Sequence, residues 1–398
     1  MIGIVTVALV GFFLTALTLQ DAFEVMLLPR RVPRHLRFTS FYFRGSWHAW
    51  SRLALRLPAG SERERFLSVF GALSMVILFA AWASCLILGF GLLEWAFQAG
   101  SVRPPPNLGE QLYMSGVTFF TLGFGDIVPH TATARAAAVI EAGTGFGFMA
   151  VVIGYLPVLY QLFSRREAHV IQLDGRAGSP PTAATLLCRH AEIGGLDKLD
   201  DLLREWEIWG SELLESHLSY PMLVYYRSQH DNQSWLAALA AIMDCCALIL
   251  VGVEESSPLQ ARMTFTMARQ VMLEMSRSCN VGPSRYTGGD RLAHDAYLRL
   301  EEEFHEAGLT WRGGAAVEET LAALRATYEP LLDGLAGYLL LPLPGWAAAE
   351  DAADHWERGH RGTIARRLIE DLARRTTLQP APGAARTRWR RLHARLRD

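Results

Sequence analysis

The sequence of 398 residues contains almost no lysine and no cysteine spacing typical of a metal site or a disulfide framework. Lys198 is its only lysine against 37 arginines, and this bias, with the many alanines, indicates GC-rich coding rather than a chemical role. The scattered cysteines form no CxxC pair, which argues against structural zinc and disulfides and favours reduced thiols in a cytosolic domain. They are Cys85, Cys188, Cys245, Cys246 and Cys279. The net charge of −2 argues neither for nor against a nucleic-acid partner, and we expect none.

The sequence also lacks the patterns that carry most enzyme chemistry. No nucleophile–base constellation and no metal-ligand cluster emerges, and the histidines, among them His190, His217, His294 and His305, lack ligand spacing. The glycine run at 143–147 (GTGFG) follows no strand and lies in an apolar setting, so it is not a dinucleotide fingerprint. We therefore expect neither enzyme activity nor a cofactor.

Long apolar runs crowd the first 163 positions, although the overall apolar content is only 51%. A bilayer crossing needs about 20 mostly apolar residues, and three segments supply them: 2–19, 66–97 and 134–163. The first could instead be a cleaved signal peptide, but it has no basic start and no small-x-small cleavage site follows. The third would reach about 45 Å as a helix, so it must tilt or project beyond the bilayer. Glu141 within it is costly unless it faces protein or water.

Arginines are distributed unevenly around these spans. Between the first and second spans lie Arg30, Arg31, Arg34, Arg37, Arg44, Arg52, Arg56, Arg63 and Arg65. Between the second and third spans lies only Arg103, with Arg135 at the helix edge. Because basic loops stay on the cytosolic side, we expect an outer N-terminus, an outward-facing connection at 99–133 and a cytosolic C-terminal region. The expected location is the cell membrane, specifically a bacterial inner membrane.

The connection between the second and third spans is too apolar at its centre for an exposed loop. LYMSGVTFF (112–120) predicts a short helix that dips into the membrane, and TLGFGD (121–126) follows it. Irregular backbone is tolerated at that depth only where protein buries it or where it lines a water-filled path. Gly123 and Gly125 can adopt positive φ at no steric cost, and their alternation with other residues would turn successive carbonyls to one side. Such oxygens can replace the water shell of a cation, which the negative carboxyl end of the helix would also favour.

Residues 66–165 resemble the pore module of the tetrameric potassium-channel family, with an outer helix, a pore helix (109–120), a filter (121–126) and an inner helix (134–163). The filter Thr-Leu-Gly-Phe-Gly-Asp is similar to the family's TVGYG loop followed by an acid. The resemblance implies K⁺ as the permeant ion and a filter formed by Thr121, Leu122, Gly123, Phe124 and Gly125. The ion would be coordinated by the carbonyls of residues 121–124 and the Thr121 hydroxyl, and Asp126 would stand at the outer mouth.

Three positions depart from the family pattern. Phe124 replaces the common tyrosine, as in two-pore-domain potassium channels, and so removes a hydroxyl that braces the filter in other members. Val117 stands where some members have a glutamate that pairs with the outer acid, and Phe120 stands where a second threonine is common. None of these changes alters the expected carbonyl geometry. A tight outer loop that merely joins two helices is the alternative interpretation.

The inner helix carries two candidates for a gating hinge. Gly145 lies where the family places its hinge, and Pro157 removes a backbone hydrogen bond and should kink the helix near its cytosolic end. Gly143, Gly145 and Gly147 could equally serve close helix packing. Ile153 to Leu156 would form any apolar constriction, which could gate by dewetting.

The 21–65 loop places Arg31, Arg34 and Arg37 three residues apart, as voltage-sensing helices do. Pro33 and the polar setting argue against such a helix, so we predict no voltage sensing. Residues 35–57 interleave aromatics with arginines, which favours a helix along the inner leaflet.

From about Arg165 the chain has helical periodicity and is expected to be a cytosolic regulatory or assembly domain with an unidentified ligand or protein partner. The segment 235–253 is apolar enough to be a fourth span, but Asp244 at its centre favours a helix buried in the domain. The arginine-rich end at 386–398 is either solvated or in contact with acidic lipid.

The sequence therefore predicts an all-α integral membrane protein. Its expected parts are a transmembrane helix (1–20), a basic loop or interfacial helix (21–65), the pore domain (66–165), a linker (166–181), a helical cytosolic domain (182–377) and a basic tail (378–398). One re-entrant loop per chain cannot close a ring, so a homotetramer in the lipid bilayer is expected. The expected function is passive, K⁺-selective conduction gated at the inner helices. The alternatives are a non-selective cation channel and a non-conducting receptor or scaffold.

Overall fold

A computed structural model describes residues 2–28, 38–192, 195–229, 232–254, 258–284, 289–349 and 368. These residues form helices and connections without a named β-strand, which confirms the all-α fold. The helices are α1 (Ile2–Met26), α2 (Phe38–Ala54), α3 (Ser61–Ala99), α4 (Leu108–Phe119), α5 (Ala132–Ala177), α6 (Ala183–Glu192), α7 (Leu199–Ser219), α8 (Trp235–Val251), α9 (Pro258–Cys279), α10 (His294–Glu306), α11 (Ala315–Arg325) and α12 (Glu329–Leu339). The short 3₁₀ helices are η1 (Leu196–Lys198) and η2 (Pro221–Tyr225).

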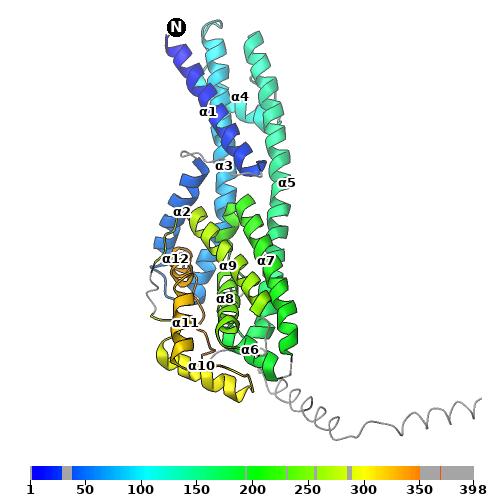
Figure 1. The fold of residues 1–398 in the computed structure, drawn as a ribbon. Coiled ribbons are helices and arrows are strands. Elements are labelled where there is room, and N and C mark those ends of the chain that lie inside the picture. The colour runs from blue at the N-terminus through cyan, green and yellow to red at the C-terminus, as the bar shows by residue number, and fades with distance from the viewer. Residues whose placement is uncertain are drawn as a thin grey trace, which may run out of the picture.

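Helices α3 and α5 are the two long rods of the molecule (Figure 1). They contain 39 and 46 residues, which at 1.5 Å per residue makes them about 58 and 69 Å long. The hydrocarbon core of a bilayer is only about 30 Å thick. Both helices must therefore extend well beyond it. α1 and α4 accompany the rods in the upper half of Figure 1, whereas α6 to α12, here called the helical domain, gather in the lower half around α5.

Three helices are long and apolar enough to cross a membrane: α1, α3 and α5, with hydropathies of 2.4, 2.4 and 1.8. They coincide with the three spans predicted from the sequence. α1 packs closely on α3 because glycines face each other: a Cβ added at Gly11 would lie 2.7 Å from the carbonyl oxygen of Gly89. Small residues let the backbones of membrane helices approach in this way. At the other end of α1, Asp21 accepts hydrogen bonds from Thr39 on α2 and Trp82 on α3.

The helix α5 continues beyond the predicted inner helix, through most of the segment expected to be a linker. It ends at Ala177, so the non-helical connection to α6 covers only residues 178–182. The extension is stable as a helix because Val170, Leu173 and Ala177 are buried in the core of the helical domain. The glycines and prolines at 175–181 are the reason that the sequence predicted a linker. In the structure Gly178 ends the helix, because it adopts the left-handed φ of +86°.

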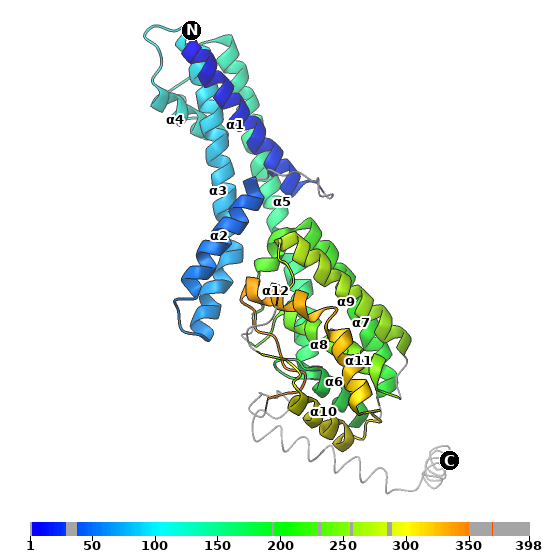
Figure 2. The ribbon, with the colours of Figure 1, turned by 60° about the vertical axis from the view of Figure 1, so that its left-hand side comes forward.

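The apolar segment considered as a fourth span is α8, the central helix of the helical domain (Figure 2). All its residues from Trp235 to Ile249 are buried, in contact with α6, α7, α9, α11 and α12. Asp244 at its centre pairs with Arg291 and accepts a hydrogen bond from the Tyr328 hydroxyl (2.6 Å). The carboxylate is thus compensated by partners within the domain, as a buried charge requires.

Aromatic side chains attach the helical domain to α2 and α3. Phe43 stacks on Tyr225, and Trp47 packs against Phe70 and Tyr225. The indole of Trp47 also donates to the carbonyl of Tyr338 (2.9 Å). α2 therefore packs against both α3 and the helical domain, and its expected position along the inner leaflet stays a prediction.

Some predicted features fall outside the described residues. These are the arginines Arg31, Arg34 and Arg37, the basic tail at 378–398 and nearly all of 350–377.

A buried histidine makes the stability of the helical domain dependent on pH. His217 on α7 is 1% exposed; its Nδ1 donates to the carbonyl of Leu213 (2.8 Å), and Arg166 faces its Nε2. Burial, together with the charge of Arg166, lowers the pKa of His217 to about 3. The folded protein therefore holds this imidazole neutral.

We expect the protein to lose stability as the pH falls below the ordinary histidine pKa of 6.5. At such pH values the unfolded chain binds a proton at His217 and the folded chain does not. The free energy of unfolding therefore falls by up to about 1.4 kcal/mol per pH unit. His217→Gln should flatten the dependence of the thermal unfolding midpoint on pH in detergent, and His305→Gln, at an exposed position of α10, should leave that dependence unchanged. An unchanged slope in His217→Gln would contradict this assignment.

Candidate functional site

The short helix α4 packs against both α3 and α5 and lies between these two helices in Figure 1. α4 begins after Asn107, whose side chain accepts a hydrogen bond from the amide of Gly109 (2.9 Å), the usual role of asparagine at this position. Its buried face includes Met114, Val117 and Phe119. The predicted pore helix thus exists, within one residue of its expected bounds.

Every second residue of the loop has a left-handed backbone. φ is +55° at Thr121, +66° at Gly123 and +78° at Gly125. The sequence predicted this conformation for the two glycines but not for Thr121, because a β-branched residue rarely adopts it. The amides of Thr121 and Leu122 donate to the carbonyls of Thr118 (3.0 Å) and Val117 (2.8 Å) and so close the end of α4, as glycine usually does at a helix end. Strain of this kind, about 1–3 kcal/mol, is typical of functional sites.

A single chain leaves this loop largely uncovered. Leu122 and Phe124 are 55% and 66% exposed, and no heavy atom lies within 4 Å of a Cβ added at Gly123 or Gly125. Asp126 is also exposed.

Buried polar side chains hold the two ends of the re-entrant segment against α3. Gln98, fully buried, donates to Gln111 on α4 (2.6 Å) and accepts from the backbone amide of His130, which follows the loop (2.8 Å). Trp95 donates to the carbonyl of Pro106, which precedes α4 (3.1 Å). Three connections therefore fix where the loop lies relative to α3.

Behind α4 lies a buried cluster of Glu94, Ser115 and Glu141, from α3, α4 and α5. Ser115 donates to the carbonyl of Ile87 (2.7 Å), and its hydroxyl also lies 2.5 Å from Oε1 of Glu141. Both carboxyl oxygens of Glu94 and Oε2 of Glu141 are buried without a hydrogen-bond partner. Glu141 therefore faces protein. This is one of the two environments, protein or water, in which a glutamate within a membrane span is tolerated. Glu94 was missed, although a glutamate near the end of an apolar span was a visible signal.

The structure gives Gly145 a packing role. A Cβ there would lie 2.1 Å from the carbonyl oxygen of Phe119, whereas Cβ atoms at Gly143 and Gly147 would meet nothing within 4 Å. Pro157 lies inside α5, which continues past it to Ala177. The hinge at Gly145 or Pro157 stays a prediction, as does a constriction at Ile153–Leu156. Within the described ranges, no group of three or more His, Cys, Asp or Glu side chains is arranged to hold a metal ion.

Comparison with known proteins singles out this part of the chain. Residues 76–161, from the middle of α3 to the middle of α5, match the model of a family described as "Ion channel". An uncharacterized membrane protein of Bacillus subtilis (strain 168), YdjJ, is 24% identical over 215 residues, which are 52% of this chain and 61% of the relative. A voltage-gated potassium channel of Aeropyrum pernix is 24% identical over 111 residues, which are 28% of this chain and 35% of the relative. The chain thus spans less than two thirds of either relative, and no solved structure matches it significantly.

The contact of Gly145 with Phe119 predicts a large effect of one methyl group. Gly145→Ala should separate α4 from α5 and lower the free energy of unfolding by about 1–3 kcal/mol, the usual cost of overpacking. Gly143→Ala is the matched control and should not destabilise the protein, because alanine fits there and is the better helix former. Thermal unfolding midpoints in detergent measure both. Equal midpoints for the two variants would mean that the helices are not in tight contact here.

Proposed function

We propose that this membrane protein is a potassium-selective channel whose filter is the loop after α4, because residues 76–161 match the model of an ion-channel family. The observation that carries the proposal is the alternation of left-handed residues at Thr121, Gly123 and Gly125. Such alternation is what a row of carbonyls on one side of an irregular segment requires. The relative from Aeropyrum pernix, described as a potassium channel, supports the choice of ion.

In this proposal the protein supplies oxygen atoms in place of water. The carbonyls of residues 121–124 and the Thr121 hydroxyl coordinate dehydrated K⁺, and conduction is passive. α4 contributes the negative end of its dipole, because its carboxyl terminus leads directly into the loop. Asp126 stands at the outer mouth of the filter. No resident cofactor is required.

We propose that four copies of the chain form the pore. The uncovered loop supports this, because one chain supplies only one side of an ion path. The inner helix adds a second argument. Val139, Phe146, Ile153 and Tyr160 recur every seven residues on α5, which places them on about one face, and each is at least 65% exposed. In a homotetramer this stripe meets neighbouring chains or lines the path below the filter, where α5 would gate by bending at Gly145 or Pro157.

Arginine placement supports an orientation with the N-terminus outside and the helical domain in the cytosol. Residues 38–65 of the described chain, which include α2, lie on the same side of the molecule as the helical domain (Figure 2). Both are thereby cytosolic in this proposal. The likeness to a membrane protein of Bacillus subtilis supports a bacterial cell membrane.

The decisive experiment is ion flux into liposomes that contain the purified protein. We expect K⁺ uptake that barium blocks, and reversal potentials in mixed K⁺ and Na⁺ that favour K⁺. Gly123→Asp should reduce the flux at least about tenfold, because a side chain at this φ distorts the filter backbone. Gly175→Asp, at an exposed and open position of α5, is the control and should conduct normally. Equal K⁺ and Na⁺ permeability would identify a non-selective cation channel, and absence of flux would favour a receptor or scaffold.

The number of subunits is tested separately. Chemical crosslinking of the purified protein in detergent should produce a ladder that ends at four chains, and its mass by light scattering should agree. A ladder that ends at two chains would contradict the fourfold pore, because the described chain contains only one re-entrant helix.

A further inference from the structure

Two glutamates lie beside each other in the apolar parts of α3 and α5, behind α4. Glu94 and Glu141 are both fully buried, and the charges of their carboxyl groups act on each other. Three of their four carboxyl oxygens have no hydrogen-bond partner. Buried polar atoms are normally satisfied, so this pair requires an explanation that the proposed ion path does not supply.

The hydroxyl of Ser115 takes part in two hydrogen bonds but carries only one proton. Its oxygen lies 2.7 Å from the carbonyl oxygen of Ile87 and 2.5 Å from Oε1 of Glu141. A carbonyl oxygen can only accept, so the serine proton points to Ile87. The bond to Glu141 then needs a second proton, and this proton can only belong to the carboxyl group. Glu141 is therefore the donor and Ser115 the acceptor.

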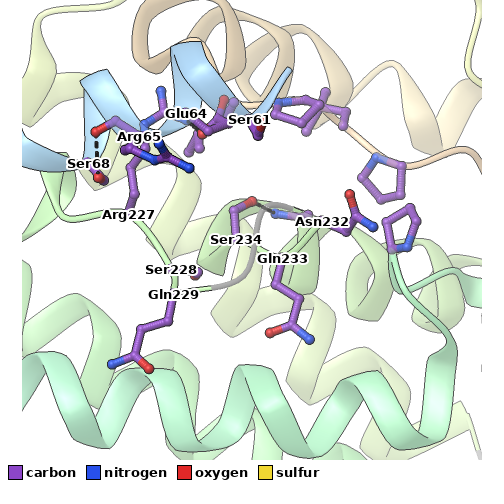
Figure 3. A pocket seen from close by; sticks show the side chains of 16 residues that line it. Ser61, Glu64, Arg65, Ser68, Arg227, Ser228, Gln229, Asn232, Gln233 and Ser234 are labelled. Atoms are coloured by element: carbon purple, nitrogen blue, oxygen red, sulfur yellow. Dashed lines mark hydrogen bonds and ion pairs between the residues drawn. The ribbon is translucent and has the colours of Figure 1, made fainter. Parts of the chain in front are cut away.

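Buried charges elsewhere in the protein have a partner of opposite sign. Arg227, next to the cavity at the start of α3 (Figure 3), lies 2.6 Å from Glu64. Among the described residues, none of the ion pairs includes Glu94 or Glu141. A carboxyl group in this position binds a proton rather than remaining ionised.

The surrounding helices bring no other titratable group to the pair. Glu110 and Tyr113 of α4, His130 after the loop and Arg135 at the start of α5 are all exposed. α1, which packs on α3, has no charged residue before Asp21. The two carboxyl groups therefore titrate against each other alone.

A metal ion is a poor substitute for the proton. Hard cations such as Ca²⁺ take about six to eight oxygen ligands, whereas the cluster offers two carboxyl groups and one hydroxyl whose proton is directed to Ile87. In the part of the chain that the structure describes, no three His, Cys, Asp or Glu side chains gather as metal ligands do. A proton needs only one acceptor, and Ser115 provides it.

We propose that Glu94 and Glu141 form a proton-binding site, and that the proton on Glu141 holds α5 against α4 through Ser115. When this proton leaves, two oxygens without a hydrogen face each other. The serine hydroxyl can then turn from Ile87 to Glu141, which gives up the bond between α4 and α3, or α5 loses its bond to α4. Either change loosens α4, whose end at Phe119 touches Gly145. Protonation of the pair thereby fixes the helix that leads into the proposed filter.

The first test is infrared difference spectroscopy of the full-length protein in nanodiscs. Wild type minus Glu141→Gln at about pH 7 should contain the carbonyl stretch of a protonated carboxyl group, which shifts in heavy water, although a solvated glutamate is ionised at this pH. Glu94→Gln should alter the same region of the spectrum. Glu110→Gln, at an exposed glutamate of α4, is the matched control and should remove only bands of an ionised carboxylate.

Glutamine can donate to Ser115 as a protonated acid does, so we expect both variants to fold. Ser115→Ala keeps both glutamates and provides a second readout: the protonated band should move to higher frequency, because Glu141 loses its acceptor. Absence of a protonated carboxyl band from wild type minus Glu141→Gln would overturn the proposal. A band that Ser115→Ala leaves in place would overturn the assignment of the proton to the bond with Ser115.

The second test rests on the proposed function. K⁺ flux into liposomes should fall about fivefold or more between about pH 7 and about pH 10, in the wild type and in Glu110→Gln alike. The double variant Glu94→Gln/Glu141→Gln should lose this dependence on pH. An equal dependence in the double variant would contradict the control of α4 by the pair. Absence of K⁺ flux at every pH would contradict the proposed function alone, because the infrared bands do not require conduction.

Discussion

The structure depends on one constraint: irregular backbone can lie at membrane depth only where protein holds it in place. In the proposed channel the loop after α4 lies at this depth, and α3 holds it in place. Gln98 connects α3 both to α4 through Gln111 and to the chain after the loop through His130. Because one fully buried side chain makes both connections, the entry and exit of the re-entrant segment are fixed relative to each other. The left-handed backbone at Thr121 is maintained by this surrounding structure, since its own conformational preference opposes it.

Helix α5 also contacts α4, which α3 holds on its other side. Gly145 brings α5 into direct contact with the backbone of Phe119 at the end of α4, and Glu141 meets Ser115 one turn earlier. α4 is thus held between two membrane helices, by polar side chains on one side and by backbone contact on the other. A movement of α5 near Gly145 would displace the end of α4, where the proposed filter starts. Gly145 could therefore serve both in close helix packing and in gating.

The two long helices also explain how a domain far from the pore could influence it. α5 continues without a break from the membrane into the core of the helical domain, and the start of α3 is bound to that domain by Glu64–Arg227. The aromatic cluster around Trp47 adds α2 to the same junction. Helices transmit displacement along their axes because their hydrogen bonds are internal. A displacement at this junction would therefore act on both walls of the proposed pore module.

The sequence by itself determined the three apolar helices, the short helix before the proposed filter and the left-handed glycines, because these follow from local features: apolar length, helical pattern and the absence of a Cβ. It also indicated that the apolar segment around Asp244 is a buried helix, since a central charge opposes a span. Only the tertiary structure decided what depends on contacts between distant residues. Val170, Leu173 and Ala177 keep α5 helical because they find a core to fill, and Thr121 is left-handed because its neighbours impose it. Gln98 acquires its role from Gln111 and His130, partners that no sequence spacing reveals.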